Sequence, residues 1–447
     1  MKNKLVLGTF NSEEFWRETS FARLPSIDDV ESKNIVSVMD ELLFVFCQKD
    51  NDAMITRYQP EDAFHQYLYD IGYRYQHISL CNNFLNQSNF DNTKCIFELL
   101  LKSLRQINTI KNREDILLSP YSVTEYTKTF CDKYFLKNEF SDIDVVKKVN
   151  SKKYSHCISQ KLDVDIGSIQ VSSPSELEIN ANKLLKNGPI VLKEFMGVSG
   201  NGNLLIDSEV KIKRLVKYFR KQEEKNKKVG LILEQFINNK KLDFSCQINI
   251  SKDGKLTILT FQQMINKGFC FKGIKEADIT LIRLIKNSNY CKIIERVGYE
   301  LYKEGYHGPA CIDSMLLEDN RLIPIVEINA RKSMGLINFK IDSLLKSYLV
   351  KGQLMHYSFS VTNEITFEKL YHNLKKANIL FLPDSRKGIL PLTCTSLKLN
   401  YQKGLINNNR YKGRLYFSLV AKTKEEEDIY LRKFQQLAIE MDLSLMN

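Results

Sequence analysis

Two neighbouring β-type runs carry carboxylates inside apolar sequence, and they constrain the fold of this chain more than any other feature. The first run is 308–317 (GPACIDSMLL) and the second is 321–328 (RLIPIVEI). The polar turn 318–320 (EDN) between them predicts a β-hairpin. Because successive side chains of a strand point to opposite faces, this pairing can place Asp313 opposite Glu327 on one face of a sheet.

Glu327 and Asn329 alternate along the second run, so both side chains are expected on the face that carries Asp313. Two carboxylates and an amide oxygen form a hard-oxygen set that suits Mg²⁺. The flanking residues are apolar, and like charges buried without a cation are costly. We therefore predict that Asp313, Glu327 and Asn329 bind metal, against the alternative of a solvated sheet face with paired charges. Arg331 follows, and its guanidinium suits a transferring phosphoryl group or a substrate carboxylate.

Lysines and glycines upstream of this hairpin indicate a site for phosphate. Lys193 lies inside the apolar run 189–195 (PIVLKEF), where its charge costs desolvation unless an anion pairs with it. The glycine-rich loop 197–203 follows, and glycines let backbone N–H groups approach phosphate oxygens. Lys152 is a second lysine that can reach a phosphate. The alternative for Lys152 is a solvated lysine, and the alternative for the glycine-rich loop is a plain hairpin turn. The loop residues that we expect to contact a nucleotide are Gly197, Ser199, Gly200, Asn201 and Gly202.

The end of the β-type run 229–237 has the character of a site for a nucleotide base. A chain that crosses between two domains here can offer backbone N–H and C=O groups to adenine, with apolar side chains around the ring. A carboxylate a few residues later can accept ribose hydroxyls. The alternative is a strand that ends in a polar turn. The residues predicted for the base and the ribose are Glu234, Gln235, Phe236, Ile237 and Asp243.

The composition argues against several other classes of protein. The chain has ten cysteines but no C-x-x-C pair, so we expect free thiols rather than zinc sites or disulfides. No segment reaches the roughly 20 apolar residues of a membrane span, and the N-terminus lacks the apolar region of a signal peptide. We therefore expect a cytoplasmic protein with no membrane partner. The net charge of +12 favours an anionic partner, yet no aromatic-interleaved basic motif points to nucleic acid.

Alternating strands and helices predict a mixed α/β architecture with four units. We expect an N-terminal α/β domain at 1–115, a central subdomain with a lid loop at 116–235, a metal-binding subdomain at 236–350 and a C-terminal extension at 351–447. In the extension, the predicted strands are 378–382, 388–392 and 414–420, and the predicted helix runs from 424 to about 441.

The order of these features resembles the ATP-grasp superfamily. A lysine, a strand lysine, a glycine-rich loop, a Glu-x-aromatic-Ile hinge, an Asp and a Glu-x-Asn follow one another over residues 145–340. The resemblance implies two α+β subdomains that clasp ATP, preceded by a small α/β pre-ATP-grasp domain. It also implies that the two lysines contact the phosphates, that the hinge contacts adenine and that the three oxygen ligands hold two Mg²⁺ ions.

The sequence departs from the D-alanine–D-alanine ligases of this superfamily at three places. Lys241 stands where those enzymes carry an acidic ribose contact, with Asp243 two residues later. Cys311 stands where they carry an arginine. The segment 329–335 (NARKSMG) replaces their Asn-Pro motif. This N-x-R-x-S-x-G form is similar to the pheganomycin-type peptide ligases of natural-product pathways, which also carry an additional N-terminal domain and a C-terminal extension.

The resemblance implies an ADP-producing ligase that joins a carboxylate to an amine through an acyl phosphate, in natural-product or peptide biosynthesis. Lys193 and Arg331 would be its catalytic residues, and an amino acid or peptide its substrate. A homodimer is the common habit of the family. One alternative keeps the fold but acts on a ribosomal peptide or a carrier-protein-bound substrate, so that an acidic leader peptide or carrier protein would be the partner. Another is a non-catalytic nucleotide-binding module. His307 is a candidate for proton transfer, against a structural role at a strand entry.

Overall fold

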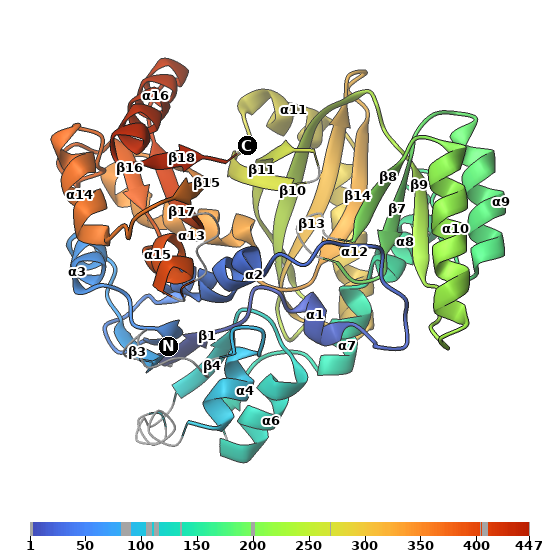
Figure 1. Ribbon diagram of the computed structural model, residues 1–447, viewed down its shortest axis with the longest axis horizontal. Coiled ribbons are helices and arrows are strands. Elements are labelled where there is room, and N and C mark those ends of the chain that lie inside the picture. Colours follow the sequence, from blue (N-terminus) through green and yellow to red (C-terminus); the bar gives the residue numbers. More distant parts are fainter. Residues whose placement is uncertain are drawn as a thin grey trace.

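Three β-sheets organise the part of the chain that the computed structural model describes, namely residues 3–81, 91–103, 110, 116–134, 136–197, 202–268, 270–402, 404 and 410–446. In Figure 1 a five-stranded sheet lies at the lower left, a four-stranded sheet at the right and a nine-stranded sheet between and above them. The mixed α/β architecture is the predicted one.

The five-stranded sheet is parallel and has the order β3-β2-β1-β4-β5. Its strands are β1 (Asn3–Leu7), β2 (Ala53–Tyr58), β3 (Gln76–Cys81), β4 (Ile116–Pro120) and β5 (Lys137–Asn138). Alternation along β1 sends Leu5 and Leu7 to a core with α4 (Ile96–Leu101) and α6 (Glu125–Tyr134), while Val6 packs on the opposite side. The sheet therefore continues past residue 115. The division of the chain into four units stays a proposal.

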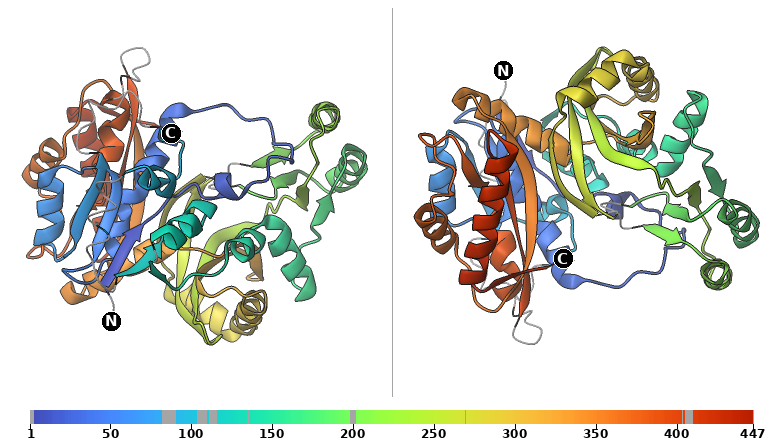
Figure 2. Two further views of the ribbon diagram at one scale, coloured as in Figure 1. Left: turned by 90° about the horizontal axis from the view of Figure 1, so that it is seen from below. Right: turned by 90° about the horizontal axis from the view of Figure 1, so that it is seen from above.

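The four-stranded sheet is antiparallel and forms a subdomain of its own. Its order is β6-β9-β7-β8, with β6 (Ile169–Val171), β7 (Ile190–Glu194), β8 (Asn203–Ile206) and β9 (Leu231–Gln235). Helices α9 (Pro174–Leu185) and α10 (Glu209–Glu223) cover one face. The apolar spacing of α10 puts its buried side chains on one stripe, and these residues are Ile212, Leu215, Val216 and Phe219. Figure 2 shows this subdomain projecting from the rest of the molecule.

The nine-stranded sheet has the order β14-β13-β10-β11-β12-β15-β17-β16, with β18 paired to β15. The predicted hairpin forms from β13 (Gly308–Leu317) and β14 (Leu322–Asn329). A second hairpin consists of β10 (Lys240–Ile250) and β11 (Leu256–Lys267). The others are β12 (Cys270–Glu276), β15 (Gly352–Val361), β16 (Gly388–Pro391), β17 (Tyr411–Val420) and β18 (Leu443–Leu445). The C-terminal residues thus extend the sheet that holds the predicted metal ligands.

One predicted strand of the extension, 378–382, is wrong. Only Leu380 makes an isolated bridge, to Ile389. Asn378 has a φ of 55°, a left-handed conformation that lies outside the β region. The preceding helix, α14 (Phe367–Lys376), therefore ends in a turn instead of leading into a strand.

The other helices lie between the strands in chain order. They are α1 (Glu13–Trp16), α2 (Val30–Ser37), η1 (Val38–Phe46), α3 (Asp62–Asp70), α7 (Ile143–Val149), α8 (Lys152–Lys161), α11 (Ile279–Asn287), α12 (Tyr290–Lys303), α13 (Met334–Leu345), η3 (Lys346–Tyr348), α15 (Thr395–Gln402) and α16 (Lys424–Glu440). All ten cysteines are free thiols. Within the described residues, no helix is both long enough and apolar enough to cross a membrane.

The core beneath the predicted metal hairpin gives a test of the packing. Ile294 of α12 is fully buried against β10, β13 and β14, whereas Ile279 of α11 is 63% exposed. We expect Ile294→Ala to destabilise the protein by about 2–5 kcal/mol, because it removes buried methylenes and leaves a cavity. Ile279→Ala should change stability little. The shift of the urea-denaturation midpoint measures both effects, and equal shifts would contradict this packing.

Candidate active site

The hairpin β13–β14 and its neighbour β10 form a sheet region with two different faces. Phe244, Cys246, Ile312 and Ile328 point to one face and pack with the apolar side of α12. On the opposite face the strand register places Asp313 between Ser245 of β10 and Glu327 of β14. The alternation that buries the apolar residues is therefore the reason that both carboxylates share the other face.

Asp313 lies at the centre of this polar face and is partly buried. Its carboxylate accepts a hydrogen bond from Asn329 Nδ2 at 3.0 Å and one from Cys311 Sγ at 3.3 Å. Burial and the neighbouring charge of Glu327 raise the pKa of Asp313 to about 7. The structure thus brings the three predicted metal ligands together, with the charge of Glu327 close enough to disfavour the ionisation of Asp313.

Lys152 joins this face to the glycine-rich loop. It is the first residue of α8, whose N-terminus is capped by Ser151. Its side chain is only 7% exposed, and Nζ lies 2.9 Å from Glu327 Oε1 and 3.3 Å from the carbonyl oxygen of Gly197. A buried ammonium between a predicted metal ligand and the start of a predicted phosphate loop is well placed for an anionic ligand.

Lys193 and Glu234 face each other across β7 and β9. Their side chains form a buried ion pair of 2.5 Å. Lys193 alternates with Leu192, which packs under α9 and α10, so Lys193 lies on the opposite face of the sheet, where Val191 and Ile232 are also buried. The predicted phosphate lysine is therefore paired with the predicted hinge carboxylate.

The remaining hinge residues are half-buried, and part of their hydrogen-bonding capacity is already used. The Phe236 N–H and the Gln235 side-chain amide both donate to the Pro189 carbonyl at 2.8 Å. The Phe236 N–H is thus committed to the protein itself, unlike the free donor predicted for adenine. Ile237 follows directly. Asp243 lies on the same face of β10 as Ser245, and it bonds Lys240 and Asn266, each at 2.8 Å.

Arg331 is held beside the polar face that carries Asp313 by Glu13, a residue for which the sequence gives no signal. We call this polar face, with the predicted metal ligands on it, the metal face. Arg331 Nε lies 2.9 Å from Glu13 Oε1, and its Nη2 donates to Asn329 Oδ1 at 3.2 Å. The side chains of Arg331 and Glu13 are 9% and 6% exposed. Burial alone would lower the pKa of Arg331, but the charge of Glu13 outweighs it and holds that pKa above its usual range. Nothing in the spacing of the chain links positions 13 and 331.

Three loop predictions, Ser199, Gly200 and Asn201, lie outside the described residues. Gly202 has a φ of +88°, and a Cβ there would come within 2.9 Å of Glu194 Oε2, so this position requires glycine. His307 lies near Ser141, with Nδ1 3.2 Å from its hydroxyl oxygen, and burial lowers its pKa. Its contacts fit the structural alternative at the entry to β13.

The donor set fits a hard divalent cation. In the described part of the chain, no three His, Cys, Asp or Glu residues gather as a metal cluster. Asp313, Glu327 and Asn329 instead supply two carboxylates and one amide oxygen from adjacent strands, the chemistry that Mg²⁺ prefers. Burial and the charge of Glu327 both disfavour the ionised form of Asp313. A cation would relieve this repulsion.

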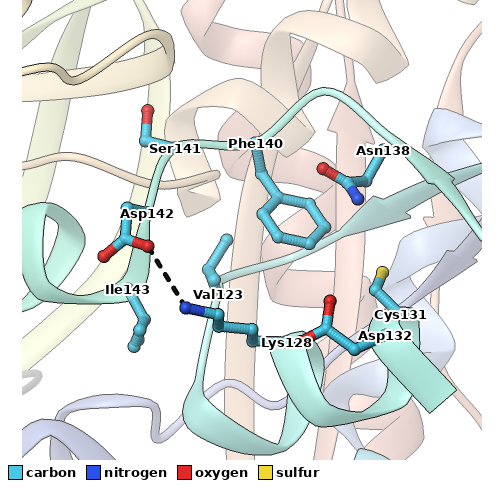
Figure 3. A pocket seen from close by; sticks show the side chains of 9 residues that line it. All are labelled: Val123, Lys128, Cys131, Asp132, Asn138, Phe140, Ser141, Asp142 and Ile143. Carbon is cyan, nitrogen blue, oxygen red and sulfur yellow. Dashed lines mark hydrogen bonds and ion pairs between the residues drawn. The ribbon is translucent and has the colours of Figure 1, made fainter.

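A separate pocket of about 220 Å³ lies beside β5 and α7 (Figure 3). Its lining residues are Val123, Lys128, Cys131, Asp132, Asn138, Phe140, Ser141, Asp142 and Ile143. Lys128 and Asp142 pair with each other at 3.5 Å. None of the predicted site residues lines it, so it gives no support to the predicted chemistry.

Comparison with known proteins adds independent information on the fold. No family model matches the chain. A [butirosin acyl-carrier protein]–L-glutamate ligase from Niallia circulans is 23% identical over 335 residues, which span 74% of this chain and 73% of that protein. Biotin carboxylase from Campylobacter jejuni, solved with β-γ-ATP, superposes with a TM-score of 0.54 at 11% identity, covering 100% of this chain and 92% of that one.

A further solved structure, N5-carboxyaminoimidazole synthetase from Staphylococcus aureus in complex with ADP, gives a TM-score of 0.52 at 10% identity. The match covers 98% of this chain and 99% of that chain. The two superpositions extend over nearly the whole chain, including the N-terminal sheet and the C-terminal strands. They confirm the predicted fold class.

The crowded carboxylates predict a conflict between stability and ligand binding. The folded-state pKa of Asp313, about 7, is above its ordinary value of 3.8, so the folded chain loses stability as the pH rises from about 4 to 7. We expect Asp313→Asn to stabilise the ligand-free protein by about 1–2 kcal/mol at pH 8 and not at pH 4. Denaturation midpoints at the two pH values measure this. Asp319→Asn, in the exposed turn of the same hairpin, is the control. A loss of stability at pH 8 would contradict the repulsion.

Proposed function

We propose that this chain is an ATP-grasp enzyme of the ADP-forming carbon–nitrogen ligase type, which activates a carboxylate as an acyl phosphate and transfers the acyl group to the amine of an amino acid or peptide. The observation that carries this proposal is the joint placement of Asp313, Glu327 and Asn329 on one sheet face, with Lys152 linking that face to the glycine-rich loop.

ATP would lie between the face of the four-stranded sheet that carries Lys193 and the polar face of β10, β13 and β14. Lys152 and Lys193 would release their carboxylate partners and pair with phosphate oxygens, which are stronger anionic partners for buried ammonium groups. Asp313, Glu327 and Asn329 would hold Mg²⁺, in the proposed form two ions, and the metal would neutralise charge on the phosphate oxygens. The hinge, including Glu234, would contact adenine.

The chemical step is a phosphoryl transfer followed by an acyl transfer. A carboxylate oxygen of the substrate attacks the γ-phosphorus, the bond to the β–γ bridging oxygen breaks and ADP leaves. The amine then attacks the acyl carbon, phosphate leaves and the amine loses a proton. Arg331, fixed by Glu13, would stabilise the phosphoryl group during both steps. Such catalysis consists largely of positioning and charge stabilisation.

The substrate proposal follows from the curated relative, whose name describes a ligation between an acyl-carrier protein and L-glutamate. We extend that to an amino acid and a carrier-protein-bound partner in natural-product biosynthesis. An acidic carrier protein would suit a chain with a net charge of +12. Free amino acids or a peptide are the alternative substrates within the same chemistry.

The test supplies Mg-ATP with pooled amino acids in two arms, one with free acids and peptides and one with acidic carrier proteins loaded with acyl groups. Release of ADP and phosphate that depends on both an acid and an amine supports the proposal. Release of AMP and pyrophosphate would indicate adenylation instead. Tight ATP binding without turnover in either arm would identify a non-catalytic nucleotide-binding module.

Glu327 connects the metal face to Lys152, so its loss should affect turnover strongly. We expect Glu327→Gln to lower kcat for ADP formation by about 100-fold or more, because a ligand to the charge-neutralising metal loses its negative charge. The matched control is Glu318→Gln, a change in the exposed turn of the same hairpin. Steady-state ADP formation measures both, and unchanged turnover in Glu327→Gln would refute the assignment.

A further inference from the structure

The short helix α1 contacts both halves of the candidate site. Glu13 begins the helix and Arg17 is its C-terminal cap residue. Glu13 pairs with Arg331 beside the metal face, and Arg17 pairs with Glu194 of β7, each at 2.5 Å. All four side chains are 12% exposed or less. A single helical turn therefore carries two buried ion pairs that lead to opposite sides of the site.

Beyond α1 the chain runs onto the four-stranded subdomain, and we call residues 13–24 the N-terminal strap. Its backbone pairs with the end of the α10–β9 connection: the Ala22 N–H donates to the Lys228 carbonyl and the Lys228 N–H to the Ser20 carbonyl, both at 2.8 Å. The Tyr218 hydroxyl donates to the Arg23 carbonyl at 2.9 Å. Figure 2 shows this N-terminal segment reaching the subdomain and returning.

The strap is also part of the apolar core of the subdomain. Ala22 and Leu24 are buried among the side chains of α9, α10 and the sheet. Phe21 stacks edge-on to Phe195 at 5.7 Å between ring centroids. A Cβ at Gly230 would come within 2.5 Å of the Phe21 ring, so the ring is seated directly on the backbone of the subdomain. The strap is thus anchored there and does not merely pass by.

The anchor point is the strand that carries the predicted phosphate lysine. The Glu194 carboxylate accepts hydrogen bonds from Arg17 and from the Leu24 N–H, and Arg17 also donates to the Met196 carbonyl. Glu194 is adjacent to Lys193, and the two side chains point to opposite faces of β7. The contacts that hold the Glu194 side chain on one face of β7 therefore also fix the backbone position from which Lys193 points to the other face.

We propose that the strap sets the position of the Lys193 strand relative to the metal face, with Arg17 and Glu13 as positioning residues. Breaking a buried ion pair by removing one partner leaves an uncompensated charge. Any movement of the subdomain must therefore carry the strap with it or break the Arg17–Glu194 pair. The consequence for turnover rests on the proposed function; the mechanical link does not.

The experiment compares Arg17→Ala, Arg17→Lys and Arg23→Ala. Arg23 lies in the same strap, but its pair with Glu14 is exposed, with side chains 57% and 46% accessible. The first readout is amide hydrogen exchange of the ligand-free protein. We expect Arg17→Ala to speed exchange in residues 17–24 and along β7 and β9, without changing the nine-stranded sheet. Arg17→Lys should restore protection in part, and Arg23→Ala should match the wild type.

The second readout is the Kd for Mg-ATP, measured by calorimetry. We expect a rise of about tenfold for Arg17→Ala, within the usual range of coupling between sites. In the ligase reaction, the share of ADP formed without amide product should rise, because a mispositioned subdomain exposes the acyl phosphate to water. A purely structural role would lower the denaturation midpoint while leaving Kd and that share unchanged.

Unchanged exchange in the subdomain of Arg17→Ala, or equal effects of Arg17→Ala and Arg23→Ala, would overturn the proposal. The exchange experiment needs no substrate. If the wild type fails to form an amide, the proposed function is refuted while the exchange and Kd data still decide the role of the strap. If Arg17→Ala does not fold, Arg17→Lys carries the same comparison, with a smaller loss of protection expected.

Discussion

The pairing of Asp313 with Glu327 across two adjacent strands is the constraint on which the rest of the site depends. Two carboxylates held side by side by strand register repel each other, and neither can move away without breaking the sheet. Positive side chains nearby offset this repulsion. Lys152 forms an ion pair with Glu327. Arg331 donates a hydrogen bond to Asn329 and is itself paired with Glu13. A phosphate ligand and its cation would enter an arrangement in which most of the charge is already in place.

The opposing half of the site has the same logic with a different partner. Lys193 and Glu234 neutralise each other on the face of the four-stranded sheet that lies opposite to α9 and α10. Ligand binding would then exchange one set of ion pairs for another, which lowers the desolvation cost of each buried charge. The two halves are linked through α1, because Glu13 and Arg17 are fixed to each other by one turn of backbone.

Local pattern was enough to predict much of this site. The alternation in 308–317 and 321–328 predicted the hairpin and the shared face of Asp313 and Glu327. The contacts of Arg331 and Glu194 with residues 13–24 were not predictable, because they join positions at least 170 residues apart with no periodic signal. Asn378 was misassigned because an apolar run follows it, whereas its left-handed backbone ends the helix in a turn. The roles of the site residues themselves stay predictions.

The continuity of the nine-stranded sheet has a consequence for how this chain can be divided. Strand β12 pairs with β11 on one side and with β15 on the other. The backbone hydrogen bonds of the sheet therefore run unbroken from the β13–β14 hairpin to the C-terminal strands. A cut near residue 350 would leave β12 as a bare sheet edge, which invites association with other chains. The C-terminal extension, residues 351–447, is therefore not a removable module, and recombination between relatives would have to exchange it together with the strands that hold the carboxylates.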